Sequence, residues 1–174
     1  QKEKVKEYNR KIEKEVNCLA EKLNLTVGTD YEKEIKIHDW ICQNISYDDE
    51  GADRSKPMRM IASHNIFGVF AHHRAQCEGL AKAVKVLLNA VDVRCIVVTG
   101  ESVKNGKRVP HAWNMVNIDG QPYHFDVTWD IGAIGSSFKR ISYDYFNLSD
   151  QLIAKEHKAD TQLPSCSSML HNYF

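Results

Sequence analysis

The sequence predicts an α+β domain, with helices first along the chain and an antiparallel sheet after them. Up to about residue 45, and again from Cys77 to Val91, apolar residues recur at three- and four-residue steps, a spacing typical of amphipathic helices. Beyond that point, segments rich in β-branched residues alternate with turn sequences, a pattern typical of strands and hairpins. Because the two patterns occupy separate parts of the chain, the strands are expected to pair with one another in an antiparallel sheet.

Composition and charge narrow the class of function. Of the 174 residues, 43% are apolar and 26% are charged, as in ordinary globular domains. The 23 basic and 23 acidic side chains cancel, whereas a nucleic-acid-binding surface would be basic. No apolar run approaches the roughly 18 residues of a membrane span. We therefore expect a function carried by a site, with no nucleic-acid partner and no membrane span in this segment.

The length suits one core domain with a helical extension. Residues 1–28 are expected to form an N-terminal amphipathic helix extension. Residues 29–150 are expected to form the core, and residues 151–174 a C-terminal segment for which no definite elements are predicted.

Three helices are predicted before the sheet. The first covers residues 2–24, and the second begins near Thr29, which has capping-box spacing to Glu32. Residues 46–76 lack clear periodicity and are predicted to be loops with short helical turns. The third helix starts after Gln76, and its apolar stripe is formed by Leu80, Val84, Leu87, Leu88 and Val91.

Strands are predicted in the second half of the chain. Val93–Thr99 is rich in β-branched residues and predicts a strand, whereas Gly100–Pro110, which contains the turn signal Asn105-Gly106, predicts a loop. His111–Ile118 and Gln121–Trp129 predict two further strands, joined by a two-residue Asp-Gly turn that favours a hairpin. The tail from Ile131 is expected to hold short elements at best.

The cysteines favour a free reactive thiol over a disulfide framework. Their number is odd, the chain is long for a disulfide scaffold, and no Cys-x-x-Cys pair is present. They are Cys18, Cys42, Cys77, Cys95 and Cys166.

Cys77 stands at the predicted start of the third helix. The unpaired N–H groups and partial positive charge of a helix N-terminus favour a thiolate, which is the nucleophilic form. The same N–H groups could bind the oxyanion of a tetrahedral intermediate, and Gly79 would let a substrate approach closely. The alternative is a buried structural cysteine.

The predicted hairpin brings a histidine and a carboxylate to one face. If the Asp-Gly turn has two residues, Trp113 faces Asp126 and His111 faces Thr128. His111 and Asp126 are then diagonal neighbours, about 7–8 Å apart at Cα, where a carboxylate can orient an imidazole. A one-residue bulge would place them on opposite faces. The alternative to a paired function is that His111 is a strand-end histidine and Asp126 a surface carboxylate.

Several motifs carry a family resemblance. "QCEGLAKAVKVLLNAVDVRCIVVTG", "HAWNMVNIDGQPYHFDVTWD" and "YDYFNLSD" resemble the transglutaminase-core family, especially its bacterial members. "IHDWICQNISYD" resembles the helix that precedes that core. The resemblance runs from about Tyr31 to Asp150, with the motifs in the family's order. It implies a papain-like core, in which the cysteine helix packs on an antiparallel sheet.

The family's nucleophile matches Cys77, its base His111 and its orienting acid Asp126. The resemblance implies acyl transfer through a thioester, acting on protein or peptide amides without a cofactor. Protease or amidase activity is the alternative within this chemistry, and a non-catalytic binding module on the same fold is the alternative outside it. Bacterial members are often secreted or surface-attached, which implies such a location here, while a cytoplasmic one stays open.

Other residues are candidates for the same cleft. Gln76, Trp113 and Tyr47 are candidates for substrate or oxyanion contacts, although Trp113 and Trp129 could equally be core aromatics.

The segment before the third helix could alternatively form a zinc site. His64, His72 and His73 could bind the ion together with Cys77. Their spacing matches no familiar zinc pattern, and the ion would occupy the nucleophile, so no metal site is predicted.

Overall fold

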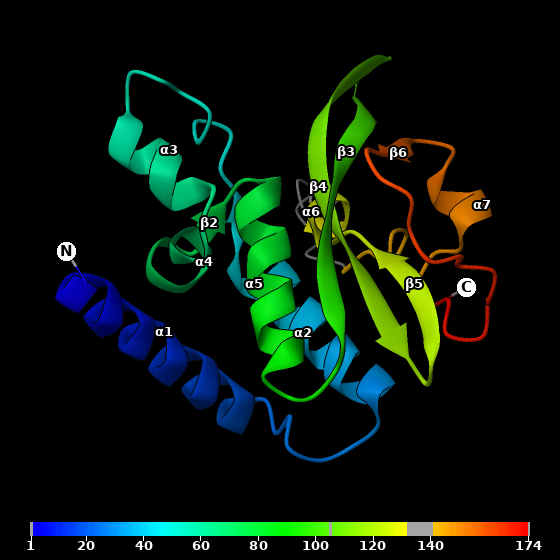
Figure 1. Ribbon diagram of the computed structural model, residues 1–174, viewed down its shortest axis with the longest axis horizontal. Coiled ribbons are helices and arrows are strands. Elements are labelled where there is room, and N and C mark those ends of the chain that lie inside the picture. The colour runs from blue at the N-terminus through cyan, green and yellow to red at the C-terminus, as the bar shows by residue number, and fades with distance from the viewer. Residues whose placement is uncertain (1, 105, 132–140, 174) are drawn as a thin grey trace.

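The structure, a computed structural model, describes residues 2–104, 106–131 and 141–173. In this part of the chain, most helices lie on one side and the sheet on the other, with α5 against the sheet (Figure 1). The predicted α+β class is confirmed. The helices that precede the main sheet are α1 (Lys2–Lys22), α2 (Asp30–Asn44), α3 (Pro57–Ser63), α4 (Ile66–His72) and α5 (Cys77–Asn89).

The main sheet has the strand order β5-β4-β3-β6 in the described residues, and each strand is antiparallel to its neighbours. A separate pair, β1 with β2, is parallel and lies just before α5. Two short helices, α6 and α7, follow β5. The bounds are β1 (Ser46–Tyr47), β2 (Arg74–Ala75), β3 (Cys95–Lys104), β4 (Lys107–Ile118), β5 (Gln121–Phe125), α6 (Val127–Ile131), α7 (Asp150–Ile153) and β6 (His157–Ala159).

The core lies between α5, α2 and the sheet. The apolar stripe predicted for the third helix is buried there, and α1 adds two side chains from its last turns. This packing fixes the N-terminus of α5 relative to β3 and β4, which is what positions the site. No helix among the described residues is long and apolar enough to cross a membrane. The core includes Val16, Leu19, Ile37, Ile41, Leu80, Val84, Leu87, Leu88, Val116, Tyr123 and Phe125.

The predicted starts of the second and third helices are confirmed. The Thr29 side chain accepts a hydrogen bond from the Glu32 N–H at 3.2 Å, and the Glu32 carboxylate accepts one from the Thr29 N–H at 2.8 Å. This is the capping box that the sequence predicted. Gln76 is the N-cap of α5, as the sequence also predicted.

The loop predicted for Gly100–Pro110 is wrong. β3 continues to Lys104 and β4 begins at Lys107, so the two strands run up to the Asn-Gly turn. Gly106 takes a left-handed φ of +73°, as a tight turn needs, while Asn105 lies outside the described residues. The Asn-Gly signal therefore lay between two long paired strands, whose last register pair at this end is Lys104 with Lys107.

The strand predicted for Gln121–Trp129 is too long. β5 ends at Phe125, and the chain then turns into α6. The Asp126 Oδ1 atom accepts a hydrogen bond from the Thr128 N–H at 3.0 Å, as a side chain at a helix start does. This local bond competes with strand pairing and starts the helix at the point where β5 stops.

Residues 46–76 hold more structure than the sequence predicted. Two seven-residue helices, α3 and α4, and the β1–β2 pair lie in this segment. Of the tail for which short elements were predicted, residues 132–140 lie outside the described residues, and residues 141–173 contain the short elements α7 and β6. β6 matters most, because it joins the edge of the main sheet next to β3.

A buried glutamate in α2 makes the stability of the fold depend on pH. Glu34 is fully buried, and its Oε2 atom accepts a hydrogen bond from Asn147 at 2.7 Å. Burial raises the pKa of Glu34 to about 8, although the bond from Asn147 opposes this. The raised pKa means that its stabilising contribution is complete below the unfolded pKa of about 4.3 and is lost as the pH rises through about 8.

Replacing Glu34 by glutamine is expected to flatten this dependence. Between pH 5.5 and 8, stability of the wild type should fall relative to Glu34→Gln by about 1.4 kcal/mol for each pH unit. Urea unfolding at the two pH values measures the difference. Glu21→Gln, an exposed change on α1, is the control. Parallel pH curves for wild type and Glu34→Gln would contradict the expectation.

Candidate active site

Cys77 is the first residue of α5 and is half-buried. The chain enters the helix from β2, and the Gln76 N–H donates to the Ser63 carbonyl oxygen at 2.9 Å, which fixes this entry. Gly79 does not face substrate space. A Cβ atom there would lie 2.3 Å from the Ser63 carbonyl oxygen, so this glycine lets α5 pack against the end of α3.

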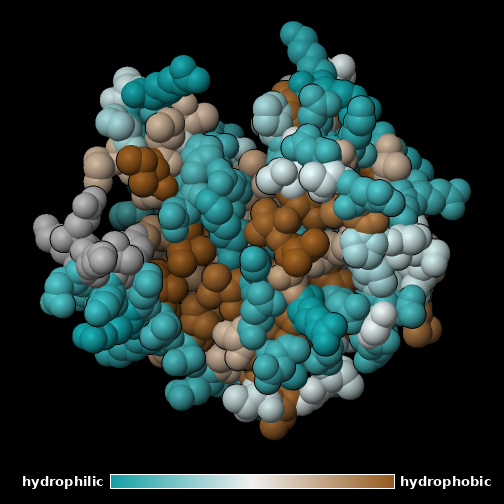
Figure 2. Space-filling view, viewed as in Figure 1, coloured by the Kyte–Doolittle hydropathy of each residue, from teal (hydrophilic) through white to brown (hydrophobic). Residues whose placement is uncertain are grey.

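The Cys77 side chain lines a cavity of about 590 Å³. Figure 2 shows a notch in the upper edge of the molecule, between the α3–α4 region and the tip of the β3–β4 hairpin. The cavity is lined on one side by β1 and the start of α5. On the other side it is lined by the parts of β3 and β4 nearest the tip of their hairpin. The lining residues are Tyr47, Asp49, Gln76, Cys77, Ser102, Val103, Val109, Pro110, His111, Thr128 and Trp129.

His111 and Asp126 form a direct pair. His111 lies on β4, and its Nε2 atom donates to Asp126 Oδ2 at 2.7 Å. The predicted turn holds, because Asp119 and Gly120 both take left-handed φ values and Ile118 faces Gln121. The strand register therefore brings the pair together, although Asp126 lies just past the last paired residue of β5 rather than within a strand.

The geometry directs the other nitrogen of His111 toward the thiol. Because Nε2 is bonded to Asp126, the hydrogen bond that links His111 to Cys77 uses Nδ1. Burial lowers the pKa of His111, but Asp126 and Cys77 outweigh it and raise that pKa to about 9. Burial alone would raise the pKa of Asp126, yet the charge and hydrogen bonds of the two histidines beside it lower that pKa. The ionised Asp126 carboxylate therefore favours the imidazolium form of His111.

The other cleft candidates occupy different places. Tyr47 and Gln76 line the cavity, and the Tyr47 hydroxyl donates to Gln76 Oε1 at 2.9 Å. Burial, followed by the charge of Cys77, raises the pKa of Tyr47 to about 12, so its hydroxyl stays protonated. Trp113 is 1% exposed and packs in a second apolar cluster behind the sheet, while Trp129 lines the cavity.

A buried ion pair holds the helix that follows Asp126. His38 on α2 donates from Nδ1 to Asp39 at 3.0 Å and from Nε2 to Asp130 at 3.1 Å. Two donating nitrogens mean a charged ring, and although burial opposes it, these carboxylates raise the pKa of His38 to about 11. Asp130 belongs to α6, so the pair ties α6 to α2 and fixes the backbone beside Asp126.

The same region contains a second Cys–His–Asp set. The Cys42 sulfur lies 3.6 Å from His38 Nε2, which also contacts Asp130. All three side chains are buried, and burial raises the pKa of the Cys42 thiol. A substrate cannot reach this set, so accessibility distinguishes it from the set that lines the cavity.

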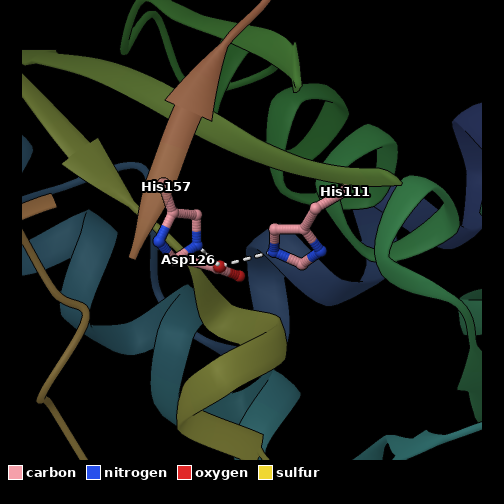
Figure 3. Close-up of side chains that lie close together, drawn as sticks. All are labelled: His111, Asp126 and His157. Atoms are coloured by element: carbon pink, nitrogen blue, oxygen red, sulfur yellow. Dashed lines mark hydrogen bonds and ion pairs between the residues drawn. The ribbon is translucent and has the colours of Figure 1, made fainter. Parts of the chain in front are cut away.

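Sequence reasoning missed His157. Its Nε2 atom donates to Asp126 Oδ2 at 2.8 Å, the same oxygen that His111 contacts. Figure 3 shows the two imidazoles on opposite sides of the carboxylate, with His157 coming from β6. No motif surrounds this histidine in the sequence. Only the pairing of β6 with β3, which places His157 opposite Ser102, brings it to the site.

The zinc alternative gains no support from the described residues. Ligand-type atoms come together there in two groups, and neither contains Cys77, His64, His72 or His73. In both groups a carboxylate already accepts hydrogen bonds from the neighbouring histidines. The groups are His111 with Asp126 and His157, and His124 with Asp150 and Cys166.

Comparison with known families agrees with this geometry. The model of the transglutaminase-like superfamily matches residues 17–127, which is more than half of the chain and includes Cys77, His111 and Asp126. The chain belongs to the transglutaminase-like superfamily. Its resemblance to that family in sequence is thereby confirmed, and so is the expected fold, because solved transglutaminase-like structures share the arrangement.

Individual relatives are distant and longer. The transglutaminase-like chain is 25% identical to the kyphoscoliosis peptidase of Mus musculus over 84% of its length, and 25% identical to that of Homo sapiens over 77%. It spans less than a quarter of each peptidase, 23% and 22%.

Two solved structures share the fold. A crystal structure of a TGase has a TM-score of 0.57 and 21% identity, covering 74% of this chain and 34% of that one. A candidate cysteine protease from Cytophaga hutchinsonii has a TM-score of 0.53 and 21% identity, covering 67% and 37%.

Proposed function

We propose that this transglutaminase-like chain is a thiol acyl-transfer enzyme acting on amide groups of proteins or peptides. The observation that carries the proposal is the His111–Asp126 pair, 2.7 Å long, which meets Cys77 in one accessible cavity. A nucleophile, a base and a group that orients the base are the parts that covalent acyl transfer needs.

The proposed reaction has two stages. The Cys77 thiolate attacks the amide carbonyl carbon, and the carbonyl electrons move to oxygen to give a tetrahedral oxyanion. As the oxyanion collapses, the C–N bond breaks and the His111 imidazolium gives its Nδ1 proton to the leaving ammonia or amine. The acyl group is then a thioester on Cys77. Water or an amine, deprotonated by His111, attacks that thioester. The C–S bond breaks, which gives the carboxylic acid or the new amide and restores the Cys77 thiolate beside the His111 imidazolium.

Oxyanion binding is assigned to the start of α5. Backbone N–H groups in a helix's first turn have no carbonyl partner within the helix, and Cys77 occupies that turn. The Gln76 amide is directed at the Asp48 carbonyl oxygen, and the Tyr47 hydroxyl contacts Gln76. Tyr47, whose hydroxyl stays protonated beside Cys77, is the side chain we expect to assist these N–H groups, by turning its single O–H from Gln76 Oε1 to the oxyanion.

Hydrolysis of peptide bonds is the second candidate for the same site. The relatives that favour it are a peptidase and a candidate cysteine protease, whereas the TGase structure favours amine transfer. The chemistry up to the thioester is shared, so the acceptor alone separates the two. A non-catalytic binding module is the third reading, and the accessible thiol beside a raised-pKa histidine argues against it.

Selective alkylation tests the nucleophile without knowledge of the substrate. With iodoacetamide at pH 6.5, Cys77 is expected to react at least about tenfold faster than any other cysteine, because a histidine partner favours its thiolate. Burial raises the thiol pKa of Cys42 and Cys95, and raises that of Cys166 to about 12, so these three should stay unlabelled. Peptide mass spectrometry gives the rate at each site.

Cys18, exposed on α1, is the internal reference for an accessible thiol without a histidine partner. Equal rates at Cys18 and Cys77 would remove the support for an activated nucleophile. A glutamine-containing peptide, incubated with and without a primary amine, then separates the acceptors. Ammonia release without amine incorporation indicates hydrolysis of the side-chain amide, and new peptide termini indicate proteolysis.

A further inference from the structure

His157 lies in a closed aromatic environment next to the proposed site. Its side chain has no exposed surface, and the rings of Trp113, Trp129 and Tyr145 lie with centroids 5.0–5.8 Å from its own. The ring of His111 lies 5.2 Å away. An imidazole held on so many sides has little freedom to rotate, so its Nε2 atom stays aimed at Asp126.

The strand that carries His157, β6, packs close to β3 because a glycine lies between them. Gly100 on β3 faces Ala159 of β6, and a Cβ atom there would lie 2.1 Å from the Lys158 carbonyl oxygen. Only glycine permits this approach. On its other side, Gly100 pairs with His111 of β4, so this glycine lies between the two strands that carry the histidines.

The hydrogen-bond pattern fixes the tautomer of His157. A carboxylate only accepts hydrogen bonds, so the proton lies on Nε2, which donates to Asp126 Oδ2 at 2.8 Å. The Nδ1 atom is buried and has no hydrogen-bond partner among the described residues. Asp126 thus accepts three hydrogen bonds, from His111, His157 and the Thr128 N–H, and both of its oxygens are engaged.

We propose that His157 is a positioning residue, which holds the Asp126 carboxylate ionised and oriented so that His111 presents Nδ1 to Cys77. The inference rests on the proposed function, because it assigns His157 to the same reaction. His157 touches neither the thiol nor the cavity. It acts through Asp126, which would otherwise have to keep a charge inside an aromatic and apolar surrounding with one fewer donor.

Loss of the His157 donor should weaken the thiolate–imidazolium pair at acidic pH. A buried carboxylate that loses a hydrogen bond takes up a proton at higher pH. A protonated Asp126 no longer supports the charge on His111, so Cys77 would become nucleophilic only at higher pH. The opposite outcome has a physical basis too, since an Asp126 relieved of one donor could bind His111 more strongly and shift the reactivity to lower pH.

Two substitutions separate the hydrogen bond from the shape. In His157→Gln, the amide nitrogen falls at the position of Nε2 and can still donate to Asp126. In His157→Asn, the amide is too short to reach that position. The rate of Cys77 alkylation by iodoacetamide is measured from pH 4.5 to 8 in both variants and in the wild type, with thermal unfolding as the check on folding.

The half-maximal pH of Cys77 alkylation is expected to rise by about one unit in His157→Asn and to stay within about 0.3 unit of the wild type in His157→Gln. No shift in His157→Asn, a downward shift, or equal shifts in both variants would overturn the proposal. An unreactive Cys77 in the wild type would instead overturn the proposed function, so the two failures are distinguishable.

A second measurement uses the unaltered chain and covers the case in which His157→Asn fails to fold. Nitrogen-15 NMR of labelled histidine is expected to show His157 protonated at Nε2 at pH 7, and an Nδ1-protonated tautomer would overturn the assignment. The three clustered side chains could also bind a metal ion. Suppression of Cys77 alkylation by one equivalent of Zn²⁺, reversed by EDTA and absent in His157→Asn, would overturn the proposal in favour of a metal site.

Discussion

Replacing Cys77 by alanine is expected to abolish amide turnover, with a loss of at least about 10⁴-fold in kcat/KM. No other accessible thiol in the described residues lies beside a histidine–carboxylate pair, because the similar set at Cys42 is buried. The change removes one sulfur from a half-buried position and should leave folding almost intact. Hydrolysis and amine incorporation on a glutamine-containing peptide measure the loss, with thermal unfolding in parallel.

Cys18→Ala is the matched control, since it makes the same change on the exposed surface of α1. It should retain wild-type turnover. Wild-type turnover in Cys77→Ala would show that the nucleophile is elsewhere. If the wild type is inert on a broad panel of amides and yet binds a peptide or glycan tightly, the non-catalytic reading should replace the enzymatic one.

The histidine–carboxylate pair is expected to show unequal losses. His111→Ala should cost nearly as much as Cys77→Ala, because it removes both the base and the acid that protonates the leaving amine. Asp126→Asn should cost about 10²- to 10³-fold in kcat, less than the roughly 10⁴-fold of the serine-protease example, because a thiolate forms more readily than an alkoxide. Steady-state kinetics on the same peptide measures both.

The hydrogen bonds around Asp126 predict a loss of stability in Asp126→Asn as well as a loss of activity. Donors reach both carboxylate oxygens, so an asparagine NH₂ in either orientation must face at least one N–H. Asp126→Asn should therefore also lower the melting temperature. Asp160→Asn, at an exposed position, and His171→Ala, at a partly exposed one, are the controls. Activity in His111→Ala above that in Asp126→Asn would contradict the assignment of His111 as base.

Local signals in the sequence were enough for the main features of this site. The capping box at Thr29, the start of α5 at Cys77 and the two-residue Asp-Gly turn each depend on residues a few positions apart. Such short-range geometry is readable because it is set by backbone dihedrals and nearby hydrogen bonds. The turn then fixed the strand register, and the register predicted that His111 and Asp126 would meet.

The ends of β3, β4 and β5 were predicted wrongly, because two local preferences compete there. The Asn-Gly signal led to the prediction of a loop over Gly100–Pro110, where the structure has the paired ends of β3 and β4. At Asp126, the side chain accepts a hydrogen bond from the Thr128 N–H and α6 begins, so β5 ends at Phe125 and does not reach the predicted Trp129. In both places the balance depends on pairing and packing that a short window does not contain.

By itself, the sequence determined the family, the α+β class, the helix that begins at Cys77 and the face shared by His111 and Asp126. Only the tertiary structure decided that His157 joins them, because it arrives on an edge strand whose pairing with β3 depends on the close approach at Gly100. Burial likewise decided which Cys–His–Asp set a substrate can reach, because the set at Cys42 is buried and the set at Cys77 lines the cavity. Solvent access is a property of the whole packed chain, whereas turns and caps belong to neighbouring residues.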